Sequence, residues 1–168
     1  MTCVKCELAY NRHHIVFGEG TVPNNLMIIG EAPGYKEDLI GRPFVGKSGE
    51  LLREKLIKYD LDYGFITNVV KCRPKNNTIL NQSQIDTCKH QFLFKEINAV
   101  KPKFIITVGS VALSLFFTGL VTEMSGNVYK LNNVYILPLI HPSYAIRNNC
   151  IDKFDSDLAM IRYFTLNL

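Results

Sequence analysis

Apolar runs and mixed polar stretches alternate along the chain in the pattern of strands separated by helices. Three short apolar runs, at 25–30, 65–70 and 104–108, have the length and the β-branched content of strands that are buried on both faces. A fourth run, at 134–137, follows the segment 127–131 across two asparagines. This arrangement predicts a β-hairpin.

Helical spacing of apolar residues fills the stretches between these runs. The segment SGELLREKLIKYD predicts a helix that begins at Ser48 as its N-cap. An S-x-x-D pattern from Ser83 predicts the start of a long helix that ends before Pro102. Ser110 is expected to cap a short helix with the sequence VALSLFF, and a last helix is expected over 152–164.

Strands separated by helices of ten or more residues are typical of right-handed crossover units. The sequence therefore predicts an α/β fold with a mostly parallel sheet and helices on both of its faces. The chain has 168 residues, of which 47% are hydrophobic and 20% charged, and it shows no internal repeat or linker. These values predict one folded domain over 1–168 and exclude disordered and low-complexity classes.

No stretch approaches the roughly 20 uninterrupted apolar residues of a membrane-spanning helix. The first five residues include polar and cysteine residues where a signal peptide needs an apolar run, so we expect a reducing, cytoplasmic location. A formal net charge of +4 is compatible with a polyanionic partner, but it identifies none.

In open parallel sheets, functional groups gather at the loops that follow the carboxyl ends of the strands. Three such loops are rich in glycine, proline or polar residues: GEAPGYKEDLIGRPFVGKSG at 30–49, KCRPKNN at 71–77 and LIHPSYAIRNN at 139–149. We expect an active site where these loops meet. Six cations in these loops either contact phosphates or form a solvated rim: Arg42, Lys47, Lys71, Arg73, Lys75 and Arg147.

Four side chains in or beside these loops are candidates for chemistry, and each has a structural alternative. Glu31 either orients a water molecule or is a solvated turn residue. Asn68 interrupts an apolar strand, so its amide must bind a ligand or satisfy nearby backbone groups. His141 either donates a hydrogen bond to a developing anion or is structural. Phe44 either stacks on a base or packs in the core.

The cysteines form a separate pattern. Cys3 and Cys6 make a C-x-x-C, and Cys72 and Cys88 follow far along the chain. Four thiolates suffice for one metal site. The long spacing between Cys72 and Cys88 suits an iron–sulfur cluster better than zinc. The alternative is that these two are buried thiols without a metal. Cys150 is a fifth cysteine with no partner in this pattern.

Taken together, the motifs GEAPG followed by ED, then GRPFVG, TNVVKCRP and HPSY, with the four cysteines in register, resemble the family 4 uracil-DNA glycosylases. The similarity spans residues 3–147. It implies a three-layer α/β/α sandwich around a central four-stranded, mostly parallel sheet. It also implies a DNA repair enzyme that hydrolyses the N-glycosidic bond of deoxyuridine, releasing uracil and leaving an abasic site.

The resemblance also implies roles for individual residues. Glu31 would position the catalytic water, and His141 would donate to O2 of uracil. Phe44 would stack on the base, Asn68 would read its edge, and Glu37 would lie near C5 and exclude thymine. The remaining substrate contacts fall on Gly30, Gly34 and Ser143. A [4Fe-4S] cluster would be held by Cys3, Cys6, Cys72 and Cys88.

The implied partner is uracil-containing DNA, single- or double-stranded, bound by a monomer. The chain departs from the family after KCRP, where KNNTILNQSQ replaces a stretch that usually bears proline and arginine, and KSG stands where a small apolar residue often precedes glycine. It lacks the histidine-bearing basic insertion of relatives that trap DNA covalently. The alternatives are a non-catalytic iron–sulfur DNA-binding accessory protein and a cysteine-ligated electron-transfer protein.

Overall fold

A computed structural model describes residues 2–168 and shows a central five-stranded sheet in the order β2-β1-β3-β5-β4. The four parallel strands are β2 (Phe65–Asn68), β1 (Leu26–Gly30), β3 (Phe104–Val108) and β5 (Val134–Leu139). β4 (Tyr129–Leu131) pairs antiparallel with β5, which confirms the predicted hairpin. The expected parallel sheet of four strands is therefore present, and the hairpin adds a fifth strand at one edge.

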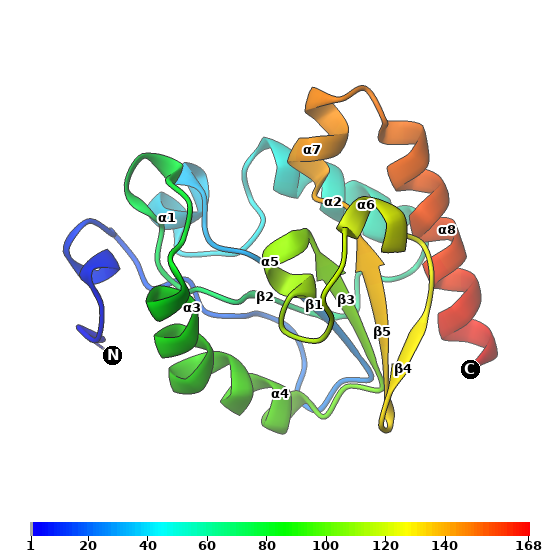
Figure 1. Cartoon of the computed structure of the whole chain (residues 1–168), viewed down its shortest axis with the longest axis horizontal. Coiled ribbons are helices and arrows are strands. Elements are labelled where there is room, and N and C mark those ends of the chain that lie inside the picture. The colour runs from blue at the N-terminus through cyan, green and yellow to red at the C-terminus, as the bar shows by residue number, and fades with distance from the viewer. Residues whose placement is uncertain (1) are drawn as a thin grey trace.

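Helices cover both faces of this sheet, which gives the predicted three layers (Figure 1). The helical segments are η1 (Glu7–Tyr10), α1 (Tyr35–Ile40), α2 (Lys47–Lys58), η2 (Lys75–Asn77), α3 (Gln82–Cys88), η3 (Lys89–Leu93), α4 (Phe94–Val100), α5 (Ser110–Leu113), α6 (Val121–Met124), α7 (Pro142–Arg147) and α8 (Ile151–Asn167). Within residues 2–168, none of these helices is both long and apolar enough to cross a bilayer.

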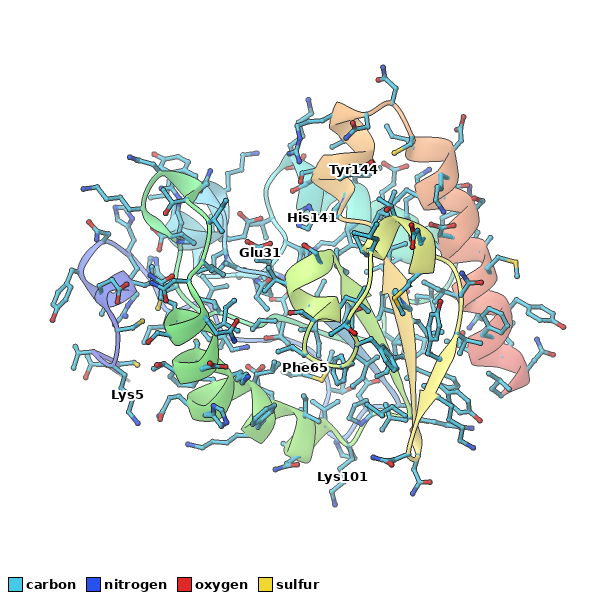
Figure 2. All side chains as sticks on the ribbon, in the orientation of Figure 1. Lys5, Glu31, Phe65, Lys101, His141 and Tyr144 are labelled. Atoms are coloured by element: carbon cyan, nitrogen blue, oxygen red, sulfur yellow. The ribbon has the colours of Figure 1, made fainter. Side chains whose placement is uncertain are left out.

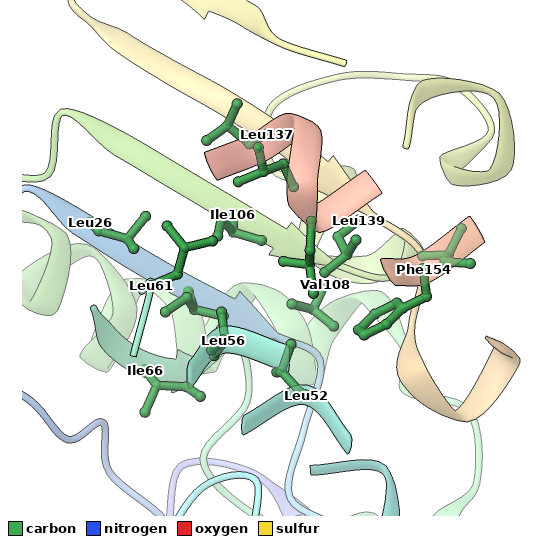
Figure 3. Packing of buried hydrophobic residues seen from close by; sticks show 14 of the residues in the cluster. Leu26, Leu52, Leu56, Leu61, Ile66, Ile106, Val108, Leu137, Leu139 and Phe154 are labelled. Carbon is green, nitrogen blue, oxygen red and sulfur yellow. The ribbon is translucent and has the colours of Figure 1, made fainter. Parts of the chain in front are cut away.

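Alternation along the strands divides the core into two clusters. Leu26 and Ile28 of β1 belong to the same cluster as Leu52 of α2 and Phe154 of α8. Figure 3 shows Leu26, Leu52 and Phe154 in this cluster. Their neighbours on β1 point to the other face, where α3, η3, α4 and α5 pack. Every residue of β1 and β3 is buried, as the continuous apolar runs predicted.

Several predicted helix boundaries are wrong, and the structure shows why. Asn81, rather than Ser83, caps α3: its Oδ1 accepts the N–H of Gln84 at 2.9 Å, and Gln84 Oε1 accepts the N–H of Asn81 at 3.0 Å. α2 begins at Lys47, so Ser48 is inside the helix and is not its N-cap. The helix expected after Ser110 starts at that residue and ends by 113.

Two segments that the sequence analysis interpreted as loops contain short helices. α1 lies within 30–49 and α7 within 139–149. The second strand also ends at Asn68 rather than at residue 70, so that Asn68 becomes its last residue. α1 and α7 stand on the same edge of the sheet, the edge at which the parallel strands end (Figure 1).

Candidate functional site

The carboxyl ends of the parallel strands bring the predicted loops to one edge. Gly30 and Asn68, the last residues of β1 and β2, are directly paired in register. Gly109 and His141 follow the paired ends of β3 and β5. Between these ends lies an open cavity of about 560 Å³, within the size range of small-molecule sites. Figure 2 shows Glu31 and His141 at this edge.

All the predicted catalytic and substrate residues except Gly30 are among those that line this cavity: Glu31, Gly34, Glu37, Phe44, Asn68, His141 and Ser143. Gly30 lies directly against two of the lining residues, because a methyl group there would overlap both the ring of Phe44 and the Oδ1 of Asn68. Only glycine lets the ring and the amide approach the backbone of β1 so closely. The structure therefore brings the predicted side chains together around one cavity.

Asn68 is buried, yet its side-chain amide is open. Its backbone oxygen accepts a hydrogen bond of 2.5 Å from the Nζ of Lys71. The side-chain amide itself has no hydrogen-bond partner within residues 2–168, although only 3% of the residue is exposed. The amide therefore faces the open cavity, where a ligand can take its hydrogen bonds.

His141 is held in a defined orientation and protonation state. Its Nδ1 accepts the backbone N–H of Ser143 at 3.1 Å and lies 2.7 Å from the Ser143 hydroxyl. Burial lowers the pKa of His141 to about 4, with Arg147 acting in the same direction and Glu37 against it. The ring is therefore neutral at pH 7, and because Nδ1 accepts, the proton is on Nε2. His141 is therefore a neutral hydrogen-bond donor through Nε2–H.

Glu31 follows β1, and its backbone oxygen accepts the N–H of Val70 at 2.9 Å. Its carboxyl group has no hydrogen-bond or ion-pair partner within residues 2–168. Burial raises the pKa of Glu31 above the ordinary value of 4.5. A partly desolvated carboxylate with free lone pairs can accept a hydrogen bond from a water molecule and orient it.

The loop that carries Phe44 is braced on two sides. Glu37 Oε1 accepts the N–H groups of Val45 at 2.9 Å and Gly46 at 2.7 Å, just before α2. Arg53 donates to the backbone oxygen of Phe44 at 2.9 Å. Phe44 has a positive φ of 54°, a conformation that costs roughly 1–3 kcal/mol and needs such bracing. Phe44 packs in the core and also lines the cavity. Core packing is therefore confirmed, and stacking on a base stays a prediction.

Two of the six cations expected to contact phosphate or form a solvated rim form ion pairs with glutamates of this chain instead. Lys71 is fully buried, and its Nζ contacts Glu96 Oε2 at 2.7 Å and Thr67 Oγ1 at 2.7 Å. Arg42 forms a two-pronged ion pair with Glu19 at 2.9 and 3.0 Å. The prediction is wrong for Lys71, because its partner Glu96 lies on a distant helix that the sequence could not place beside it.

The four cysteines of the predicted metal site surround a second, small cavity: Cys3, Cys6, Cys72 and Cys88. Its other walls are largely apolar. Burial raises the pKa of the Cys88 thiol to about 11, and it also raises that of Cys72. Thiols in such surroundings become thiolates when a metal coordinates them.

Two N–H donors already point at these sulfurs. The backbone N–H of Lys71 donates to Cys88 Sγ at 3.2 Å, and Arg12 Nη1 donates to Cys72 Sγ at 3.3 Å. Within residues 2–168, no group of three or more potential ligands is arranged around one point that could hold a metal ion. A zinc site would need four sulfurs arranged in that way. In a cubane each cysteine binds a different iron, so sulfurs around a cavity and donors to sulfur fit an iron–sulfur cluster.

Part of the cavity wall was not predicted from the sequence. Ser110 lines it from α5, Thr122 from α6 and Tyr144 from α7. Ser110 was open to prediction, because it lies just after β3 and the other loops were identified by their place after a strand. In the structure, Gly109 before it has a φ of 90° and packs on the ring of His141. Nothing in the sequence marks Thr122 as part of the site.

The sequence matches a known protein family. Residues 17–164 match the model of the uracil DNA glycosylase superfamily. The chain therefore belongs to the uracil DNA glycosylase superfamily, and the resemblance drawn from its motifs is confirmed.

Curated relatives narrow the class. A type-4 uracil-DNA glycosylase of Thermotoga maritima is 41% identical, over 87% of this chain and 79% of that protein. Enzymes of the same name from Sulfurisphaera tokodaii and Pyrobaculum aerophilum are 35% and 36% identical, over 96% and 94% of this chain and 80% and 87% of theirs. The chain is thus similar to type-4 enzymes along nearly its whole length.

Proposed function

We propose that this chain is a single-domain, monomeric DNA repair glycosylase that hydrolyses the N-glycosidic bond of deoxyuridine in DNA. The observation that carries the proposal is the open amide of Asn68 in a cavity that also holds Glu31, Phe44 and His141. Each of these groups meets one demand of the reaction. The products are free uracil and an abasic site.

Uracil would enter the cavity only after it leaves the base stack. Its ring would lie against Phe44. The Oδ1 of Asn68 would accept from N3–H and its Nδ2 would donate to O4, which satisfies the buried amide. Glu37 and Gly34 would close the side of the ring near C5, where thymine carries a methyl group.

Bond cleavage moves the electron pair of the N1–C1′ bond onto the base. His141 would donate from Nε2–H to O2 and stabilise the negative charge that develops there. Ser143 would position the imidazole through Nδ1. Glu31 would orient a water molecule toward C1′, and its negative charge would also stabilise the cationic sugar. The water oxygen forms the new bond to C1′ and releases one proton to solvent. The released base takes its proton from solvent.

The four cysteines would hold a [4Fe-4S] cluster away from the substrate cavity. Bound there, the cluster would cross-link the amino-terminal segment with the loop after β2 and with α3. Its contribution would be structural, since no cysteine lines the substrate cavity within residues 2–168.

The proposed activity is tested by mixing the protein with single- and double-stranded oligonucleotides that contain one uracil, then detecting abasic sites by alkaline cleavage. The expected result is strand cleavage at uracil and none at thymine or cytosine. Binding of uracil-containing DNA without abasic sites would favour the non-catalytic accessory role instead.

Protein purified without oxygen is expected to contain about four irons per chain, as a cubane on four thiolates requires. Cys88→Ala should lower the iron content and the melting temperature. Its effect on the single-turnover rate of uracil release should be the smaller one. Cys150→Ala is the matched control and should leave the iron content unchanged. Stoichiometric zinc without iron would contradict the assignment, and so would a Cys88→Ala variant of normal stability that has lost the chemical step.

A further inference from the structure

Ser125 and Asp157 are two buried polar residues that take no part in the proposed catalytic steps. Ser125 directly follows α6, and Asp157 lies on α8. The Oγ of Ser125 donates a short hydrogen bond of 2.5 Å to Oδ2 of Asp157. Neither residue is among those that line the substrate cavity. Burying a hydroxyl and a carboxylate is costly unless both are hydrogen-bonded, so this contact fixes where the two side chains lie.

The same hydroxyl also holds the main chain that leads to His141. The backbone N–H of Ile140 donates to Ser125 Oγ at 3.0 Å. Ile140 is buried and lies between Leu139, the last residue of β5, and His141. Because the Ser125 hydroxyl gives its proton to Asp157, its lone pairs are left to accept the N–H of Ile140. Asp157 therefore orients a hydroxyl that holds the backbone directly before His141.

Asp157 is itself held from two sides. The Nζ of Lys153, one turn earlier on α8, donates to Oδ1 at 3.0 Å and to Oδ2 at 2.9 Å. Gly126 packs against the carboxylate, because a methyl group there would lie 2.6 Å from Oδ1. The N–H of Gly126 also donates to the backbone oxygen of Pro138 in β5 at 3.0 Å. α8, the turn after α6 and the end of β5 are therefore joined.

The turn at Ser125 also ends a helix that forms part of the cavity wall. Val121 and Thr122 of α6 line the cavity, and the N–H of Ser125 donates to the backbone oxygen of Val121 at 2.9 Å. α6 and α8 both pack against β5 (Figure 1). Ser125 thus connects one wall of the cavity with the strand end that carries His141.

We infer that Ser125 is a positioning residue for His141 and that Asp157 orients its hydroxyl, an inference that rests on the proposed glycosylase function. A preorganised donor acts only from the place where it is held before charge develops, and a displacement of about 1 Å can cost on the order of 10²-fold in rate. Ser143 sets the orientation of the imidazole, whereas Ser125 sets the position of the main chain that carries it.

The test measures single-turnover uracil release together with the affinity for uracil-containing DNA. Ser125→Ala should slow release roughly tenfold and leave the affinity within about twofold of wild type. Asp157→Asn keeps an oxygen that accepts from Ser125, so its rate should stay within about threefold of wild type, whereas Asp157→Leu should lose about as much as Ser125→Ala. Ser156→Ala is the matched control, because Ser156 is exposed on α8 and does not line the cavity.

Nuclear magnetic resonance of ¹⁵N-labelled histidine rings separates positioning from loss of the fold. The chain has four histidines. In Ser125→Ala, the ring signals of His141 should shift, while those of His13, His14 and His90 should coincide with wild type. If Ser125→Ala does not fold, Ser125→Cys carries the same test, because a thiol keeps the size of the side chain and forms weaker hydrogen bonds.

A wild-type rate in Ser125→Ala would overturn the positioning role, and so would a slower rate with unshifted His141 signals. Equal losses in Asp157→Asn and Asp157→Leu would remove Asp157 from the arrangement. A wild-type protein that releases no uracil would instead refute the proposed function, so the two failures are distinct.

Discussion

Glu31→Gln is expected to slow uracil release by roughly 10²-fold or more under single-turnover conditions, while the affinity for uracil-containing DNA stays nearly unchanged. The substitution keeps the size of the side chain and removes its negative charge. It therefore weakens the orientation of water and the stabilisation of the cationic sugar, both of which act on the chemical step. Rate constants from quenched single-turnover reactions and binding by fluorescence anisotropy separate the two effects.

The pH dependence provides a second readout for Glu31. Because burial raises its pKa above 4.5, the rate should fall with decreasing pH at a higher pH than an exposed glutamate would give. A folded state with a raised carboxyl pKa binds more protons than the unfolded chain, so this group costs stability as pH rises through that window. Glu31→Gln should thus be at least as stable as wild type at pH 7.

Glu54→Gln is the matched control for Glu31→Gln. Glu54 lies on α2 with 72% of its side chain exposed, and it does not line the cavity. Its variant should keep the wild-type rate and pH profile. A wild-type rate for Glu31→Gln, or a loss explained by a lowered melting temperature, would remove Glu31 from the mechanism.

The sequence predicted the site better than it predicted the elements around it. Gly30 and Asn68 end neighbouring parallel strands. The rule that links function to strand ends indicated the loop that begins at Gly30, whereas Asn68 was indicated by an amide that interrupts an apolar strand. The short helices α1 and α7 escaped prediction, because six residues carry too little periodicity for a helical pattern. The cap at Asn81 depends on a reciprocal pair of hydrogen bonds, and Ser83 offered a competing signal nearby.

Lys71 shows what the sequence could not supply. Its position in a polar loop indicated a phosphate contact or a solvated rim, yet its ammonium group is buried against Glu96 and the backbone oxygen of Asn68. Its backbone N–H also donates to Cys88 Sγ. One residue therefore joins the cysteine cavity to the strand end that carries the open amide. Such a link depends on packing between distant segments, which local patterns do not encode.

Asn68→Asp is expected to reduce uracil release by roughly 10²-fold or more and to lower the ratio of the uracil rate to the cytosine rate. The wild-type amide matches uracil at N3–H and O4, whereas cytosine presents an amine at position 4 and a bare acceptor at N3, so both contacts become repulsive. Aspartate replaces the donor by an acceptor. That acceptor opposes O4 of uracil and favours the exocyclic amine of cytosine.

Measuring both rates and the melting temperature on the same variant decides between recognition and structure. The amide of Asn68 makes no hydrogen bond within residues 2–168, so its replacement breaks none there. The change in base preference should therefore exceed what any loss of stability explains. Asn127→Asp, at an exposed turn outside the cavity, is the matched control and should leave the base preference unaltered. An unchanged preference at reduced stability in Asn68→Asp would refute the recognition role, because a residue that only supports the fold lowers the rates on both bases alike.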